Sequence, residues 1–293
     1  MTESFDEYLA EEIAKYKGVA VPVKSGILRR ALVRQIDPKK LHPNPNDEFC
    51  DPKIGPSYEI IGKYEQAIRE TKFHANDHPI EENMVVQRMH PDGYMILNGH
   101  HRWAAALRFH LKKVPIEIVN ETQFADFKEM VKGAKNDKRI ALDLDEVVFV
   151  SDQDPEEEKK LAFPFNKIYK ERLKRGIPAL FYFLKNNHYD IWVYSANYYG
   201  MDYIRNLFKL YHVQLDGIVT GSALNRRSDE ATRKQMKELL DNKYQQSIHL
   251  DNESLTVINN DTKDFEENKL SGSEATWSQE VMEIIGALNK HES

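Results

Sequence analysis

The amino-acid sequence predicts two α/β units in one chain. The first half mixes helical patterns with a hairpin signal, which is typical of an α+β unit. The second half alternates strand and helix patterns, which favours a parallel sheet covered by helices on both faces. A length of 293 residues also fits two domains better than one.

The composition is that of a globular protein and disfavours several function classes. Hydrophobic residues make up 41% of the chain and its formal net charge is −6, so general attraction to nucleic acid is not favoured, although a local basic patch is compatible with this balance. No apolar run approaches the roughly 20 residues that cross a bilayer, and the first residues lack a signal-peptide pattern. The single cysteine, Cys50, has no partner for an internal disulfide. We therefore expect a cytoplasmic protein with no membrane partner.

Hydrophobic spacing predicts the elements of the first half. Apolar residues at offsets of three and four residues predict helices, whereas short apolar runs beside turn formers predict strands and a hairpin. The elements expected in chain order are a helix within 1–20, short strand-like runs within 21–33, a proline-rich loop at 41–60, a helix at 58–70, a hairpin at 84–97, a helix at 100–110, a strand at 114–119 and a helix from 120 to about 133.

A charged connector after Gly133 predicts a domain boundary close to Lys135. The expected organisation is an N-terminal helix over residues 1–20, an α+β domain over 21–134 and a second domain over 138–293.

In the second half, β-rich runs alternate with amphipathic stretches. The strands expected are 140–144, 191–194, 217–219, 247–250 and 255–258, and the helices expected are 167–187, 200–212, 229–242 and 277–290. Folds of this kind place their functional sites at the carboxyl ends of the strands.

Acidic and polar residues stand at several of these strand ends. Asp143 ends the first strand, and Asp145 follows two residues later. Two carboxylates this close repel each other unless a cation lies between them, which favours a magnesium site. Ser195 follows the second strand, Asp251 follows the fourth, and Lys234 lies on the helix before Asp251, with Lys237 as an alternative.

With these residues in this order, residues 138 to 290 resemble the haloacid dehalogenase superfamily. The resemblance implies that Asp143 attacks phosphorus and that Asp145 acts as general acid and base. It further implies that Ser195 and Lys234 hold the phosphoryl oxygens, and that Mg²⁺ is bound by Asp143, Asp145 and Asp251. Glu146, where phosphatases of the superfamily usually carry glycine, and Asn252, where a second acid is common, leave a degenerate site as the alternative.

Between Asp143 and Ser195 the chain is used up by a loop, a helix and a strand, so no large cap domain is expected. The site is then open to a large substrate or covered by another part of the protein. Tyr198 and Tyr199, which follow Ser195, are interpreted as packing residues, with a role at the substrate entrance as the alternative.

The motif LNGHHRW joins a strand to a helix in the first half. A glycine at such a turn lets the backbone approach a ligand, and the unpaired N–H groups of the helix favour an anion. Arg102 offers a bidentate contact, and His100 or His101 a hydrogen bond. The motif therefore predicts phosphate binding, with an ordinary turn and a surface histidine pair as the alternative.

This motif, together with PNPNDEF and the strands around it, resembles the ParB and sulfiredoxin superfamily over residues 20 to 120. The resemblance implies a pocket for a nucleotide (ATP, ADP or CTP) formed by the residues Asn98, Gly99, His100, His101 and Arg102. Thiol repair is not expected, since His100 replaces the reactive cysteine of sulfiredoxins.

The sequence thus predicts a two-domain, magnesium-dependent phosphohydrolase that acts on a phosphorylated substrate through an aspartyl-phosphate and also binds a nucleotide. Two alternatives stay open. One is a nucleotide-binding regulatory or DNA-associated protein whose second domain is catalytically weak, and the other is a ParB-like kinase of small molecules.

Overall fold

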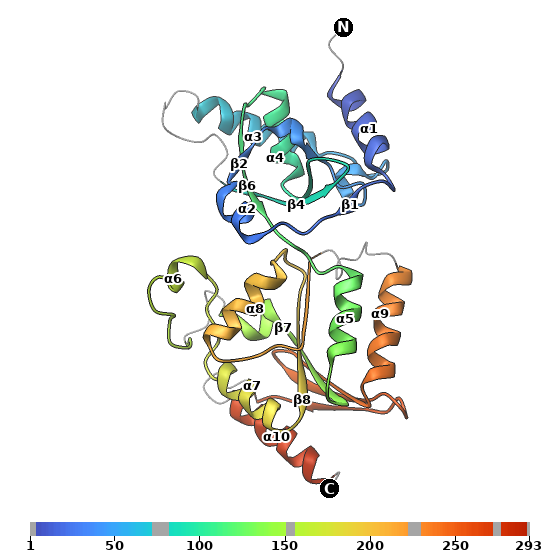
Figure 1. Cartoon of the computed structure of the whole chain (residues 1–293), viewed down its shortest axis with the longest axis vertical. Helices are drawn as coiled ribbons and strands as arrows, with labels where there is room; N and C mark the ends of the chain where they lie inside the picture. Colours follow the sequence, from blue (N-terminus) through green and yellow to red (C-terminus); the bar gives the residue numbers. More distant parts are fainter. Residues whose placement is uncertain (1–3, 72–81, 151–155, 222–229, 272–276, 292–293) are drawn as a thin grey trace. The chain divides into compact units, whose positions relative to one another are not determined.

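The protein is described by a computed structural model that covers residues 4–71, 82–150, 156–221, 230–271 and 277–291. The chain folds into two compact units, Met1–Asn120 and Glu121–Ser293, which we call the first unit and the second unit (Figure 1).

The first unit is a mixed sheet packed against helices. Its strands lie in the order β2-β6-β4-β5-β3, and β1 pairs with β4. The strands are β1 (Val21–Pro22), β2 (Gln35–Ile36), β3 (Leu41–His42), β4 (Met84–His90), β5 (Tyr94–Asn98) and β6 (Val114–Ile118). The helices are α1 (Phe5–Tyr16), α2 (Ile27–Leu32), α3 (Tyr58–Thr71) and α4 (His100–Arg108), with short 3₁₀ turns at Pro38–Lys40 and Glu48–Cys50.

Helix α1 is tied to the sheet at its end and capped at its start. Ser4 and Glu7 form a capping box at the first turn. At the other end the buried Tyr16 hydroxyl donates to Asp92 at 2.7 Å and lies 3.2 Å from His42, whose other ring nitrogen pairs with Glu12. The predicted N-terminal helix is therefore part of the first unit.

Two predictions for the first unit are wrong. The loop expected over 41–60 begins with strand β3, which pairs in parallel with β5. The run ILRRALV was expected to be strand-like, but residues Ile27–Leu32 form helix α2. Leucine, arginine and alanine favour a helix, and this local preference prevails here because, within the described part of the chain, no strand pairs with the segment.

The second unit is built on a sheet in the order β12-β11-β10-β7-β8-β9. Its strands are β7 (Lys138–Asp143), β8 (Tyr189–Ser195), β9 (Gly217–Thr220), β10 (Gln246–Leu250), β11 (Ser254–Asn259) and β12 (Phe265–Lys269). Its helices are α5 (Phe124–Gly133), α6 (Phe165–Ile168), α7 (Ile177–Asn186), α8 (Met201–Leu210), α9 (Glu230–Lys243) and α10 (Trp277–His291), and a π-helical turn spans Leu144–Val148.

Helices cover both faces of this sheet. Helices α5 and α9 pack together on one face over Trp192, while α7, α8 and α10 pack on the other over Ile191 and Val193 (Figure 1). Because side chains alternate along a strand, Trp192 and its two neighbours in β8 serve opposite faces, and all three are fully buried. A doubly covered sheet of this kind was expected from the alternating pattern.

Two details of the second unit differ from the prediction. β10, β7, β8 and β9 are parallel, but β11 runs antiparallel to β10, because the three residues between them allow a hairpin and not a crossover, and β12, a strand that was not expected, pairs antiparallel with β11. The helix expected over 167–187 is split into α6 and α7, since Leu173 bridges to Phe149 and α7 begins only after Gly176, whose φ is +90°.

The boundary between the compact units lies earlier than the expected Lys135. Helix α5 packs against α9 and β9 and so belongs to the second unit, and Thr122 already donates to the carbonyl of Ile218. Among the described helices, none is long and apolar enough to span a membrane.

Gly217 provides a test of the packing on β8. A Cβ atom at this position would lie 2.0 Å from ring carbons of the fully buried Trp192. We expect Gly217→Ala to lower the free energy of unfolding by on the order of 3 kcal/mol, because the ring has no room to move. Chemical denaturation measures this loss. Gly286→Ala in α10, where a Cβ meets nothing within 4 Å, is the matched control and should be neutral or stabilising.

Candidate functional site

The parallel register of the second unit brings the predicted site residues to one end of its sheet. Leu250 in β10 pairs with Leu142 in β7, so Asp251 and Asp143 are the next residues on neighbouring strands. Asp143 in turn pairs with Tyr194 in β8, and Ser195 is the next residue. Since neighbouring strands lie about 4.8 Å apart, the backbones of Asp251, Asp143 and Ser195 are adjacent at the carboxyl ends of the strands.

The carboxylate of Asp143 is held by the turn that follows it. Its Oδ1 accepts hydrogen bonds from the backbone N–H groups of Asp145 at 2.7 Å and Glu146 at 2.9 Å. Among the described residues, no hydrogen bond goes to Oδ2. The π-helical turn at Leu144–Val148 therefore orients one carboxylate oxygen of Asp143 through two backbone N–H groups.

Asp145 is held by side chains from the end of β8 and the loop after it. The Ser195 hydroxyl donates to Oδ2 at 2.5 Å, and the Tyr199 hydroxyl donates to Oδ1 at 3.0 Å. Ser195 is fully buried and its Oγ also accepts from the backbone N–H of Asn197 at 2.9 Å. Two of the residues predicted to act together, Asp145 and Ser195, are thus in direct contact.

The contact of Tyr199 with Asp145 was not predicted from the sequence. Burial, and after it the nearby Asp145 carboxylate, raises the pKa of Tyr199, so the phenol stays protonated and remains a donor. Only the path of the loop after β8 brings this hydroxyl to Asp145. The pattern of the sequence distinguishes it in no way from Tyr198, and packing was the favoured interpretation for both.

The carboxylate of Asp251 is hydrogen-bonded to the backbone of the turn that follows it. Its Oδ1 accepts from the backbone N–H groups of Glu253 at 2.8 Å and Ser254 at 2.7 Å, which closes the turn between β10 and β11. Among the described residues, no three side chains of His, Cys, Asp and Glu gather as a metal site. The expected donor set differs from such a cluster, because it combines the carboxylates of Asp143 and Asp251 with the backbone carbonyl of Asp145. Hard oxygen donors of this kind suit Mg²⁺.

The remaining predicted residues lie at the surface. Lys234 and Lys237 are both exposed on α9, and in the part of the chain that the structure describes no hydrogen bond or ion pair joins either to Asp143, Asp145 or Ser195. Glu146 and Asn252 are exposed as well. The choice between the two lysines is therefore open.

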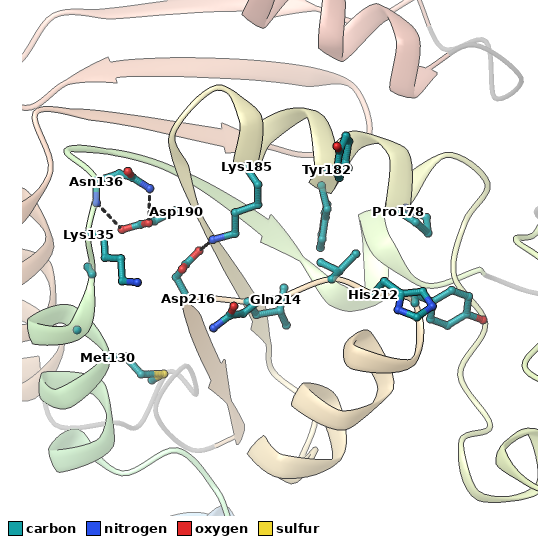
Figure 2. A pocket seen from close by; sticks show the side chains of 16 residues that line it. Met130, Lys135, Asn136, Pro178, Tyr182, Lys185, Asp190, His212, Gln214 and Asp216 are labelled. Carbon is teal, nitrogen blue, oxygen red and sulfur yellow. Dashed lines mark hydrogen bonds and ion pairs between the residues drawn. The ribbon is translucent and has the colours of Figure 1, made fainter.

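A separate cavity of about 600 Å³ lies at the opposite edge of the same sheet, near the amino ends of β8 and β9. Two of its polar pairs are in contact: Lys185 forms an ion pair with Asp216, and the side-chain amide of Asn136 donates to the buried Asp190 at 2.7 Å (Figure 2). Burial raises the pKa of Asp216 in spite of the nearby ammonium group. This cavity contains none of the predicted catalytic residues.

In the first unit, the predicted phosphate-binding turn has the expected backbone. Gly99 lies in the left-handed region with φ +106°, and a Cβ there would come within 2.7 Å of Met84, so this position requires glycine. Helix α4 begins at His100, directly after it. The first N–H groups of α4 have no partner within the helix, which is the feature that favours an anion.

The two histidines after Gly99 tie the proline-rich loop to α4. His100 Nε2 accepts from the backbone N–H of Asn44, and His101 Nε2 accepts from that of Ser57, both at 3.1 Å. Burial lowers the pKa of His100 to about 4, against the opposing effect of Asp47, and it lowers the pKa of His101 too. Both imidazoles are therefore neutral acceptors at pH 7.

Arg102 is buried and pairs with Glu82 at 2.9 Å. It also donates to the carbonyl of Asn83 at 3.2 Å and to the side chain of Asn98 at 3.4 Å. The structure thus joins Asn98 and Arg102 beside Gly99, while binding of phosphate by these side chains stays a prediction.

Comparison with known proteins finds similarity in the first half. Residues 25–131 match the family model of the ParB N-terminal domain. Two similar solved structures are of the C-terminally truncated chromosome-partitioning protein ParB from Caulobacter crescentus. In the one complexed with CTP-gamma-S, 26% of residues are identical over 34% of this chain and 51% of that chain, with a TM-score of 0.24. In the one complexed to the centromeric parS site, 25% of residues are identical over 34% of this chain and 46% of that chain, with a TM-score of 0.23.

The chain thus spans about half the length of the ParB chains that it matches. No curated protein matches it. The ParB resemblance of the first half has its counterpart in the family match, whereas the resemblance of the second half to the haloacid dehalogenase superfamily stays a prediction.

The shifted pKa of His100 predicts a pH-dependent stability of the first unit. In the unfolded chain this imidazole takes up a proton below about pH 6.5, but in the folded chain only near pH 4. The free energy of unfolding should therefore fall as the pH is lowered from 6.5 towards 4. Between pH 7 and 4.5, the free energy of unfolding should fall by about 2 to 3 kcal/mol less in His100→Gln than in the unsubstituted protein, measured by urea unfolding. His90→Gln, at an exposed site on β4, is the control, and an equal effect of both variants would contradict the assignment.

Proposed function

We propose that the second unit is a magnesium-dependent phosphohydrolase that acts through an aspartyl-phosphate on Asp143. The observation that carries the proposal is the register that makes Asp251, Asp143 and Ser195 neighbours at the carboxyl edge, with Asp145 bound to Ser195. An acid with one oriented and one available oxygen suits a nucleophile, and a second acid held by hydroxyl groups suits an acid and base catalyst.

The proposed reaction has two steps. Asp143 Oδ2 attacks phosphorus, the bond from phosphorus to the leaving oxygen breaks, and protonated Asp145 gives its proton to that oxygen. The Asp145 carboxylate then takes a proton from a water molecule, whose oxygen attacks phosphorus and releases inorganic phosphate from Asp143. Covalent capture replaces one difficult displacement by two easier ones.

The phosphoryl group carries negative charge that the site has to balance. Asp143, Asp251 and the backbone carbonyl of Asp145 would hold Mg²⁺, which when bound offsets the charge of the attacking carboxylate and the phosphoryl oxygens. Ser195 and Lys234, with Lys237 as the alternative lysine, would bind the phosphoryl oxygens. The substrate is expected to be a phosphate ester of unassigned identity.

The first unit is proposed to bind a nucleotide at the turn formed by Asn98, Gly99, His100, His101 and Arg102. Support comes from the match of residues 25–131 to the ParB N-terminal domain and from the left-handed Gly99 at the start of α4. Backbone N–H groups would meet the phosphates, since His100 and His101 already accept hydrogen bonds from the loop. ATP, ADP and CTP are the candidate ligands.

The same family match favours a second candidate function, a nucleotide-binding regulatory or DNA-associated protein whose second unit is catalytically weak. Glu146 and Asn252 are the residues that support it. A kinase that transfers phosphate from a nucleotide to a small hydroxylated compound is a third. Labelled nucleotide incubated with a pool of small hydroxyl compounds separates transfer from hydrolysis.

The nucleophile can be tested directly. Asp143→Asn should abolish magnesium-dependent release of phosphate from a panel of phosphate esters, a loss of roughly 10³-fold or more, because the amide cannot attack phosphorus. Release of inorganic phosphate with and without Mg²⁺ is the measurement. Asp261→Asn, at an exposed turn of the second unit, is the control. Unchanged turnover in Asp143→Asn would reject the assignment.

Nucleotide binding can be tested separately. Arg102→Gln removes the guanidinium beside Gly99 and should weaken binding of the best of ATP, ADP and CTP about 10-fold or more, measured by titration calorimetry. Arg108→Gln, at the other end of α4, removes an ion pair with Glu65 and should leave binding unchanged. Equal affinity of the Arg102→Gln protein and the unsubstituted protein would refute this use of Arg102.

A further inference from the structure

We propose that Tyr199 is a positioning residue that holds Asp145 for proton transfer during turnover. The inference rests on the proposed function, because it assigns a role in that reaction. It starts from the contact between the Tyr199 hydroxyl and Asp145 Oδ1 at 3.0 Å.

The position of Tyr199 is fixed by its surroundings and not only by that contact. Its backbone carbonyl accepts from the Thr220 hydroxyl at 2.8 Å, at the end of β9, and its N–H donates to the carbonyl of Asn197 at 3.0 Å. Its ring packs edge-on against Phe149, with 5.8 Å between ring centroids. Contacts within its own loop and with two other segments therefore place Tyr199, so its hydroxyl is already in position before a substrate arrives.

Tyr199 is needed because Ser195 has two possible partners for its hydroxyl proton, Asp145 and a phosphoryl oxygen of the substrate. In the structure the Ser195 hydroxyl proton is used in the hydrogen bond to Asp145 Oδ2. A serine hydroxyl has a single proton to donate. If this hydroxyl turns to a phosphoryl oxygen, Asp145 loses that donor, and among the described residues Tyr199 is then the side chain that still donates to the carboxyl group.

Loss of the Tyr199 hydroxyl should therefore harm the step in which Asp145 protonates the leaving oxygen. Poor leaving groups, such as alkoxides, need that proton, whereas p-nitrophenolate leaves readily without it. The predicted effect of Tyr199→Phe is thus selective among substrates. A general loss of folding would lower turnover of all substrates alike.

The first experiment compares kcat and KM of the full-length protein for an alkyl phosphate and for p-nitrophenyl phosphate. Tyr199→Phe should lower kcat for the alkyl phosphate roughly 10-fold or more, with little change in KM, and should change kcat for p-nitrophenyl phosphate far less. Tyr203→Phe is the matched control, because its hydroxyl binds Glu171. An equal loss on both substrates would overturn the role of Tyr199 while leaving the phosphohydrolase intact.

The second experiment needs no turnover. Thermal unfolding of Tyr199→Phe, Asp145→Ala and the double variant forms a cycle. Tyr199→Phe should lower the unfolding midpoint in the unsubstituted protein and have little effect in the Asp145→Ala background. Equal shifts in both backgrounds would overturn the contact. A coupled cycle in a protein without phosphatase turnover would retain the contact but reject both the proposed function and the positioning role of Tyr199 in that reaction.

Discussion

The parallel pairing of β10, β7 and β8 is the constraint on which the candidate site depends. It makes Asp251, Asp143 and Ser195 neighbours although they are far apart in sequence. A shift of one residue in either pairing would turn side chains to the other face of the sheet and separate the acids. The fully buried residues beside these ends, including Leu142 and Val193, specify the register, so the same packing that stabilises the second unit also places its reactive groups.

A second feature is that most polar groups of both candidate sites have defined hydrogen bonds. Asp143 and Asp251 each orient one carboxylate oxygen through two backbone N–H groups. In the first unit, His100 and His101 each accept a hydrogen bond from one backbone N–H group of the proline-rich loop. Because these groups are already oriented, binding of a ligand requires little reorganisation of the site. These hydrogen bonds also explain why these residue types stand at turns, where backbone donors would otherwise lack partners.

Sequence patterns predicted five of the strands of the second unit, β7 to β11, and the ends at which the acids stand, since apolar runs and turn formers set both. The charged strand β12 lacks such an apolar run and was not predicted. The patterns did not predict that β11 is antiparallel to β10, because pairing direction depends on the tight turn that Asp251 closes. Helix α2 was missed because its own run, ILRRALV, was interpreted together with VAVPV as strand-like. The contact of Tyr199 with Asp145 depends on how a loop folds back, which spacing cannot show.

The central claim is that Asp143 carries the phosphoryl group. The most direct test is to mix the protein with acetyl phosphate and Mg²⁺, quench it in acid within a turnover and locate the phosphoryl group by peptide mass spectrometry. The account predicts a magnesium-dependent phosphoryl group on Asp143. Phosphate release with the group on another residue, or with no phosphorylated peptide at any time, would contradict it.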